Sequence, residues 1–347
     1  MARIPVLTFT DRGIFCPAGD FHIDPWRPVD RALITHGHSD HARPGHGQYL
    51  CTHQAAPVIR HRLGPVRLET IAYGEQRRIG GVTVSFHPAG HVPGSAQIRV
   101  ERDGEVWVVS GDYKVSPDGL SEPFEPVACH TFISECTFGL PVFRWEPQEV
   151  IMAQINQWWA ANAADGSISI LGAYALGKAQ RILGGLDPSI GPILTHGAVE
   201  VTTEILRTQG YSLPTTVPVT AGVGAKSHPR AIVIAPPSAE ATPWATRFGP
   251  TAAAAFASGW MRLRGVRRRR GAETGFVLSD HADWPSLLTA IGESGASRVL
   301  VTHGSVPVMV RRLREMGLEA DALETVKLVE AAGAPADWPV VAELLKA

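Results

Sequence analysis

Three histidines and an aspartate lie in the stretch ITHGHSDHA, residues 34–42, directly after a short apolar run. The whole chain has only 14 histidines among 347 residues, so this concentration is unusual. His36 and His38 are two residues apart, which allows an extended segment or a tight loop to aim both rings at one cation. Asp40 and His41 are placed to face a second cation. The HxHxDH motif therefore predicts one half of a two-metal site.

Other residues able to bind metal follow later apolar runs. Neutral imidazole and carboxylate suit Zn²⁺ or Mn²⁺, and a bridging carboxylate lets two cations lie about 3.5–4 Å apart around one activated water. Asp112, after VWVVSG, is the predicted bridge. His91 would complete the first metal and His303 the second. A lone histidine after a strand is usually hydrogen bonded or exposed, but the HxHxDH cluster favours metal binding.

These residues require strands to position them. Runs of apolar and β-branched residues predict buried strands. The runs are ALIT, TVSF, VWVVSG, FIS, GFVLSD and RVLVT, which lead to His36, His87 and His91, Asp112, Glu135, His281 and His303 respectively. We expect the polar ends of these strands to gather at one edge of a sheet. Two later segments, WPSLLTAIGESG and VPVMVRRLREMG, are predicted to be helices that cover it.

Between residues 147 and 260 the pattern changes to longer helical segments that alternate with strands. The segment PQEVIMAQINQWWAANAADG has apolar residues near helical spacing, whereas SISIL and AIVIA are typical of strands. This alternation predicts a smaller α/β unit inserted into the first unit.

Composition limits the class of protein. The chain is 44% hydrophobic with 35 glycines and 27 prolines, which is typical of a loop-rich globular protein with one large domain or two closely joined ones. No segment supplies about 18 consecutive apolar residues for a membrane span, and the first residues lack the features of a secretory signal. The four cysteines have no CxxC spacing, which argues against a disulfide framework or a cysteine zinc site. We expect a cytoplasmic protein that does not contact membranes.

The net charge is only −1, so a polyanionic partner would have to be met by a local cluster of positive charge. One arginine cluster is present: Arg262, Arg264, Arg267, Arg268, Arg269 and Arg270. Guanidinium groups match phosphates bidentately, although a solvated hairpin could have the same composition.

The metal-binding motifs resemble those of the metallo-β-lactamase fold hydrolases. THGHSDH resembles the signature of that superfamily, and His91 in PAGHVPGSAQI, Asp112 in SGDYK and Asp24 in HIDPWRP match its other motifs. The resemblance implies an α/β fold, an αββα sandwich, in which Asp24 supports the ligand loop without touching metal. It implies two divalent ions held by seven ligands: His36, His38, Asp40, His41, His91, Asp112 and His303.

Three later motifs resemble the β-CASP branch, which contains the nucleic-acid nucleases of this fold. They are SECTFG at 134–139, LSDHADW at 279–285 and VTHGS at 301–305. The resemblance covers nearly the whole chain and implies an inserted β-CASP α/β domain. The expected boundaries are 1–145 for the first part of the metallo-β-lactamase domain, 146–270 for the insertion and 271–347 for the second part.

The same resemblance implies catalytic roles. His281, held by the carboxylate of Glu135, would donate a proton to the leaving sugar oxygen. Glu135 could instead be a strand-end cap or an ion-pair partner. Asp40 is counted with these two as catalytic.

Several residues are predicted to bind the substrate. Ser258 and Gly259 in FASGWM resemble a pair that contacts backbone phosphate in β-CASP nucleases, and Lys178 in YALGKAQ starts a helix suited to an anion. A purely structural turn would explain these three residues equally well. Arg268 and Arg269 from the arginine cluster complete the predicted set.

The stretch FCPAGDFHIDPWRPVDRALITHGHSDHARPGHG resembles the bacterial ligase-associated DNA exonucleases, often encoded near an ATP-dependent DNA ligase and a helicase. It implies a metal-dependent DNA exonuclease of DNA repair, acting on single-stranded DNA or DNA with a free end and linked functionally to that ligase and helicase. In contrast, a histidine at the position of His303 is typical of the RNA-processing members, so a β-CASP ribonuclease is the alternative. A small-molecule metallo-hydrolase would need neither the insertion nor His281, and a non-catalytic scaffold would be expected to lack metal ligands.

Overall fold

The computed structural model describes residues 5–240, 242–269 and 274–323, and the chain divides into two compact units. The first unit comprises the chain up to Pro117, Glu122–Val142 and the chain from His281 onward. The second unit comprises Asp118–Ser121 and Phe143–Asp280. It is therefore an insertion into the first unit. Its main segment begins at Phe143, shortly before the range 146–270 expected from the sequence. It ends after that range because the strand that precedes His281 belongs to its sheet.

One sheet of the first unit has the strand order β1-β2-β3-β4-β5-β6. Its strands are β1 (Thr8–Thr10), β2 (Gly13–Cys16), β3 (Phe21–Ile23), β4 (Arg31–Leu33), β5 (Gln48–Thr52) and β6 (Leu68–Ile71). The first three pair antiparallel and the last four pair parallel. Helix α1 (Ala56–Leu63) connects β5 to β6, as parallel neighbours require a crossover.

The second sheet of the first unit has the order β19-β18-β11-β10-β9-β8-β7. Its strands are β7 (Arg77–Ile79), β8 (Val82–Pro88), β9 (Ala96–Arg102), β10 (Glu105–Val109), β11 (Thr131–Cys136), β18 (Arg298–Gly304) and β19 (Glu319–Ala322). Strands β7 to β10 are antiparallel, whereas β10, β11, β18 and β19 run parallel. Helix α8 (Trp284–Glu293) precedes β18, and helix α9 (Val306–Glu315) connects β18 to β19.

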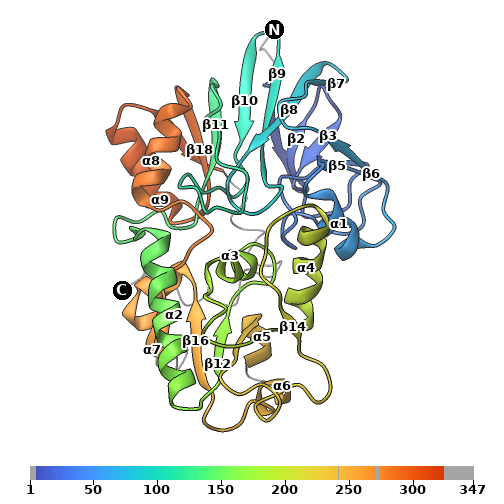
Figure 1. Ribbon diagram of the computed structural model, residues 1–347. Coiled ribbons are helices and arrows are strands. Elements are labelled where there is room, and N and C mark those ends of the chain that lie inside the picture. Colours follow the sequence, from blue (N-terminus) through green and yellow to red (C-terminus); the bar gives the residue numbers. More distant parts are fainter. Residues whose placement is uncertain (1–4, 241, 270–273, 324–347) are drawn as a thin grey trace. The chain divides into compact units, whose positions relative to one another are not determined.

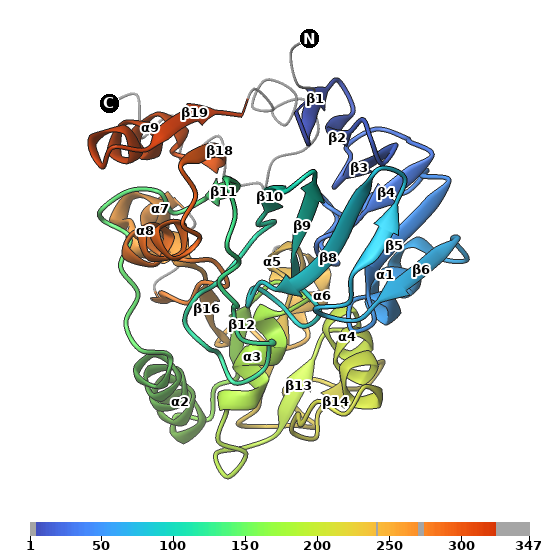
Figure 2. The ribbon, with the colours of Figure 1, turned by 90° about the horizontal axis from the view of Figure 1, so that it is seen from above.

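Alternating side chains of the strands build three apolar layers in the first unit. Between the two sheets lie buried residues from both, including Leu33, Leu50, Ile98 and Trp107. The outer face of the first sheet packs on α1, and that of the second sheet packs on α8 and α9. Figure 2 shows α1 beside β5 and β6, while Figure 1 shows α8 and α9 beside β18. This order of layers confirms the expected αββα sandwich.

The second unit contains a six-stranded parallel sheet with the order β14-β13-β15-β12-β16-β17. Its strands are β12 (Ser169–Gly172), β13 (Ile193–Thr195), β14 (Val217–Pro218), β15 (Ile232–Ala235), β16 (Ala253–Ala257) and β17 (Thr274–Phe276). Its helices are α2 (Gln148–Ala164), α3 (Lys178–Gly185), α4 (Gly197–Thr208), α5 (Pro237–Glu240), α6 (Pro243–Thr246), η1 (Gly259–Arg262) and α7 (Arg264–Arg269).

Both faces of this parallel sheet are buried. On one face Leu171 and Ile234 pack with residues of α2, α3 and α4. On the other face Ile170 and Val233 pack with Phe248. Burial on both faces explains why IVIA in β15 is continuously apolar and does not alternate with polar residues.

Most of the expected elements form. The long amphipathic segment becomes α2, SISIL and AIVIA become β12 and β15, and the two late helices become α8 and α9. One expectation is wrong: the run GFVLSD contributes β17 to the sheet of the second unit, where it pairs with β16. The polar strand ends also come from more than one sheet, since β4 and β10 lie in different sheets. No described helix combines the length and the apolar character needed to span a lipid bilayer.

We expect Trp159→Ala to lower the free energy of unfolding by about 3–5 kcal/mol. Trp159 is fully buried on α2, and its Nε1 donates a hydrogen bond to the carbonyl of Arg230 at 2.9 Å. Trp158, the preceding residue, is only partly buried, so Trp158→Ala is a matched control with a clearly smaller loss. Denaturant unfolding followed by circular dichroism measures both values, and equal losses would contradict the packing described.

Candidate metal centre

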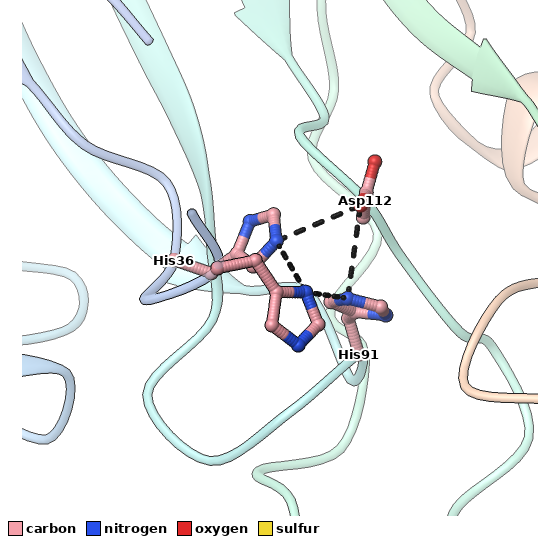
Figure 3. A group of neighbouring side chains, drawn as sticks. His36, His91 and Asp112 are labelled. Carbon is pink, nitrogen blue, oxygen red and sulfur yellow. Dashed lines mark hydrogen bonds and ion pairs between the residues drawn. The ribbon is translucent and has the colours of Figure 1, made fainter. Parts of the chain in front are cut away.

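Four donor atoms converge in the first unit, on loops that follow β4, β8 and β10. The Nε2 atoms of His36 and His91 lie 3.0 Å and 3.1 Å from Nδ1 of His38. Asp112 Oδ2 lies 3.5 Å from His36 Nε2 and 3.7 Å from His91 Nε2. Figure 3 shows the side chains of His36, His91 and Asp112 directed toward one another. Ligands about 2.1 Å from a tetrahedral ion are about 3.4 Å apart, so these spacings suit one metal ion.

Asp112 also faces the second set of predicted ligands. His41 Nε2 lies 3.5 Å from Asp112 Oδ2 and 3.7 Å from Asp40 Oδ2. The ring of His303 lies further out, with its centroid 6.2 Å from that of the His41 ring. The second set is therefore more widely spaced than the first. A single carboxylate oxygen lies between His36 and His41, which is the position that a bridging ligand requires.

His303 is presented by an irregularity in β18. The pairing with β11 shifts register, because Glu135 is opposite Thr302 whereas the next residue, Cys136, is opposite Gly304. His303 is the extra residue, and its φ is +55°. At Gly304 a Cβ would lie 2.0 Å from the carbonyl oxygen of Cys136, so only glycine allows this approach. A β-bulge of this kind redirects one side chain toward a site.

The carboxylate of Asp24 orients two of the histidines. It accepts hydrogen bonds from the amide and the hydroxyl of Thr35 at 2.8 Å and 2.6 Å, and from Nδ1 of His41 at 2.7 Å. Because the hydroxyl proton of Thr35 goes to Asp24, Thr35 Oγ1 accepts a hydrogen bond from Nδ1 of His36 at 3.0 Å. In both rings Nε2 is therefore the nitrogen that faces Asp112.

Burial and charge set the protonation of the cluster. Burial lowers the pKa of His36 well below its usual value, and the neighbouring histidines act in the same direction, so this ring is neutral. Burial opposes charge on His41 too, but nearby carboxylates, Asp112 foremost, outweigh it and raise the pKa of His41 well above its usual value. For Asp112, burial raises the pKa, but the charges of His41 and His281 outweigh it and hold the pKa well below its usual value. A cation bound here would replace the proton on His41.

Glu135 and His281 form a pair beside the metal-binding residues. Glu135 is buried and accepts a hydrogen bond from His281 Nδ1 at 2.8 Å. The amides of Tyr113 and Thr137 donate to the same carboxylate at 3.0 Å and 3.2 Å. The ring centroid of His281 lies 4.6 Å from that of His91. The structure therefore brings the two residues together, with Nδ1 of His281 engaged by Glu135.

The predicted phosphate contacts in the second unit have structural partners. The hydroxyl of Ser258 accepts a hydrogen bond from the Trp260 amide at 3.3 Å and caps η1, which begins at Gly259. Lys178 is buried at the start of α3, with its Nζ 3.0 Å from Asp280 Oδ2. Phosphate binding by Ser258, Gly259 and Lys178 stays a prediction.

The arginine cluster is described only in part. Arg262 and Arg264 are exposed at η1 and at the start of α7. Arg268 and Arg269 belong to α7, but their side chains lie outside the described part of the structure, and Arg270 lies outside it altogether. Their binding to phosphate also stays a prediction.

Two residues without metal-binding chemistry shape the centre and were not predicted. Thr35 links Asp24 to His36, as described above. Gly111 has φ +57°, and a Cβ on it would lie 2.7 Å from Cβ of Thr35, so glycine allows the loop of Asp112 to approach that of His36. Thr35 directly precedes His36 and Gly111 directly precedes Asp112 in the sequence. This position next to a predicted ligand was the only sequence signal that could have identified them.

Comparison with known proteins gives relatives with ligase and nuclease names. The chain is 30% identical over 315 residues to a probable DNA ligase of Opitutus terrae, which is 90% of this chain and 30% of that protein. It is 27% identical over 191 residues to a ribonuclease of Thermus thermophilus, which is 47% of this chain and 44% of the ribonuclease. The chain thus spans less than half the length of both curated relatives.

Among solved structures, a protein of unknown function from Enterococcus faecalis V583 has a similar fold. The TM-score is 0.59 with 10% sequence identity, over 85% of this chain and 79% of that one. This likeness concerns the fold alone. No protein-family profile matches the chain.

We expect Asp24→Asn to weaken zinc binding by about 10–100-fold, because it removes the carboxylate that orients His41 and, through Thr35, His36. Asp20→Asn is a matched control, since Asp20 is exposed and has the same left-handed backbone, with φ of 50° against 44° for Asp24. Zinc titration against a competing chelator measures both variants. Equal affinities in the two would show that Asp24 does not support the ligands.

Proposed function

Because the chain belongs to the β-CASP nucleases of the metallo-β-lactamase fold, we propose that it hydrolyses phosphodiester bonds with two divalent cations bound. The convergence of donor atoms from His36, His38, His91 and Asp112 carries this proposal. Imidazole and carboxylate ligands suit Zn²⁺ and Mn²⁺, so these are the proposed ions. Asp40 and His41 of the loop and His303 of β18 are proposed to hold the second.

The proposed reaction divides the work between the ions and the protein. When bound, the cations would lower the pKa of water toward about 7 and neutralise charge on the phosphoryl oxygens. Asp40, exposed beside His41, is proposed to accept a hydrogen bond from the attacking water. His281 is proposed to donate a proton from Nε2 to the leaving sugar oxygen, since its Nδ1 is bonded to the buried carboxylate of Glu135.

We propose DNA, single-stranded or with a free end, as the substrate. The relative named as a probable DNA ligase matches 90% of this chain, whereas the ribonuclease matches 47%. In the former, a region similar to this chain is part of a longer protein that is named for joining DNA. That name supports DNA as the substrate, while the proposed links to an ATP-dependent DNA ligase, to a helicase and to DNA repair rest on the sequence resemblance.

An RNA-processing ribonuclease is the second candidate, favoured by the name of the Thermus thermophilus relative and by His303. However, RNA is distinguished from DNA by contacts to the 2′-hydroxyl, and a histidine engaged by metal has little left to offer that group. A small-molecule hydrolase would use the metal centre but would leave the inserted unit and the pair of Glu135 and His281 without a role.

The substrate is tested with end-labelled single-stranded DNA, duplex DNA and RNA of one sequence, at matched salt and metal. We expect progressive shortening of DNA from an end, with RNA degraded more slowly. Asp112→Asn, which removes the proposed bridging charge, is the inactive control. Faster degradation of RNA would establish the ribonuclease in place of the DNA enzyme, and no cleavage of any substrate would refute the proposed function.

His281→Ala is expected to slow cleavage of an ordinary phosphodiester by roughly 10²–10⁴-fold, as for a lost general acid. Hydrolysis of bis-nitrophenyl phosphate, whose leaving group needs no proton, should fall much less. His87→Ala is a matched control, because His87 also has a glutamate partner, with Nδ1 3.4 Å from Glu125 Oε1. Comparable losses on both substrates would argue against proton donation by His281.

A further inference from the structure

Two arginines hold the HxHxDH loop through its backbone. Arg62, in the last turn of α1, donates a hydrogen bond from Nη1 to the carbonyl of Gly37 at 2.6 Å. Arg43 donates from Nε to the carbonyl of Asp40 at 3.0 Å. Gly37 lies between the predicted ligands His36 and His38, and Asp40 is itself a predicted ligand, so both arginines contact the loop that carries the metal-binding residues.

Each guanidinium has more donors than the loop uses. A guanidinium carries five N–H groups in a planar fork, and in the described structure each arginine gives one of its guanidinium N–H groups to a loop carbonyl. No described carboxylate lies within ion-pair distance of Arg43 or Arg62, although Arg62 interacts electrostatically with Asp40. Arg62 is exposed and Arg43 is partly exposed. Positive charge is thus available at the rim of the centre.

The neighbouring sequence increases this charge. The last turn of α1 carries Arg60, His61 and Arg62, and its first turn has no acidic residue. By contrast, several exposed arginines of the first unit have a carboxylate at ion-pair distance, for example Arg27, whose Nη1 lies 2.8 Å from Asp11 Oδ2. Guanidinium groups without a carboxylate at ion-pair distance, next to a centre proposed to cleave phosphodiesters, suit the planar, bidentate recognition of phosphate.

We propose that Arg43 and Arg62 bind a backbone phosphate of the nucleic-acid substrate that neighbours the phosphate being cleaved. This inference rests on the proposed nuclease function and assigns to the metal-binding unit a substrate contact of its own. The contact carries no base information, because every nucleotide presents the same phosphate. By holding that neighbouring phosphate, the two arginines would position the scissile phosphate over the ligands.

The test uses the full-length protein and the variants Arg43→Gln, Arg62→Gln and their combination, since glutamine keeps an N–H donor but removes the charge. With a DNA oligonucleotide, each single change should raise KM by about tenfold, as expected for a lost charge-assisted hydrogen bond, with a smaller change in kcat. The double variant should also reduce the slope of log KM against log salt by about 1 to 2. The loss on bis-nitrophenyl phosphate, which has no neighbouring phosphate, should be at least several-fold smaller.

Arg78→Gln is the matched control, because Arg78 is an exposed arginine of the first unit on β7. Its KM and salt dependence should equal those of the wild type. Arg62→Lys keeps the charge, so it should retain most of the salt slope even where KM rises. Metal content is measured for every variant.

Three outcomes would overturn the inference. Unchanged KM and salt slope in the double variant would show that the arginines do not contact substrate. Equal losses of activity on the oligonucleotide and on bis-nitrophenyl phosphate would show that the arginines only support the loop. The same conclusion would follow if Arg62→Lys and Arg62→Gln both lost metal while the salt slope stayed unchanged. If the wild type cleaves neither DNA nor RNA, the proposed function itself fails. That result is distinct from the three above, because it is obtained without any variant.

Discussion

The hydrogen bonds that converge on the carboxylate of Asp24 are the interaction on which the candidate metal centre depends. One side chain accepts from the amide and hydroxyl of Thr35 and from the ring of His41, and Thr35 in turn accepts from His36. A histidine binds metal only through a nitrogen that lacks a proton, so fixing which nitrogen carries it decides whether the ring is a ligand. Asp24 makes that choice for both rings, from a left-handed backbone conformation with φ of +44°.

The αββα sandwich explains how these polar groups can be buried. Asp24 follows β3 and His36 follows β4 in one sheet, whereas Asp112 follows β10 in the other, so their loops meet where the two sheets end. The amide of Ala96 donates to the carbonyl of Thr35 at 2.8 Å and ties the loops of the two sheets together. Buried polar groups are stable only with hydrogen-bond partners, and the network around Asp24 supplies them. Arg43 and Arg62 hold the same loop from its exposed side.

Local patterns were sufficient for much of the fold. The near-helical spacing of Ile151, Ile155, Trp158 and Trp159 predicted α2, in which all four are buried except the partly buried Trp158. The segments SISIL and AIVIA predicted β12 and β15, and burial on both faces of the parallel sheet explains why β15 has no polar alternation. The pattern could not assign each strand to a sheet. The run before His281 therefore resembled the runs before the other predicted ligands. In the structure it contributes β17, which pairs with β16 in the sheet of the second unit.

By itself, the sequence determined the types and the chain positions of the candidate ligands, since the spacing in HxHxDH restricts where those rings can point. Only the tertiary structure decided how they are used. It joined His281 to Glu135, which are 146 residues apart, and it placed one oxygen of Asp112 between His36 and His41. It also redirected His303 through a register shift in β18 and engaged Lys178 with Asp280. The physical reason is that hydrogen bonds and strand register join atoms that are near in space, and a sequence states only which residues are near along the chain.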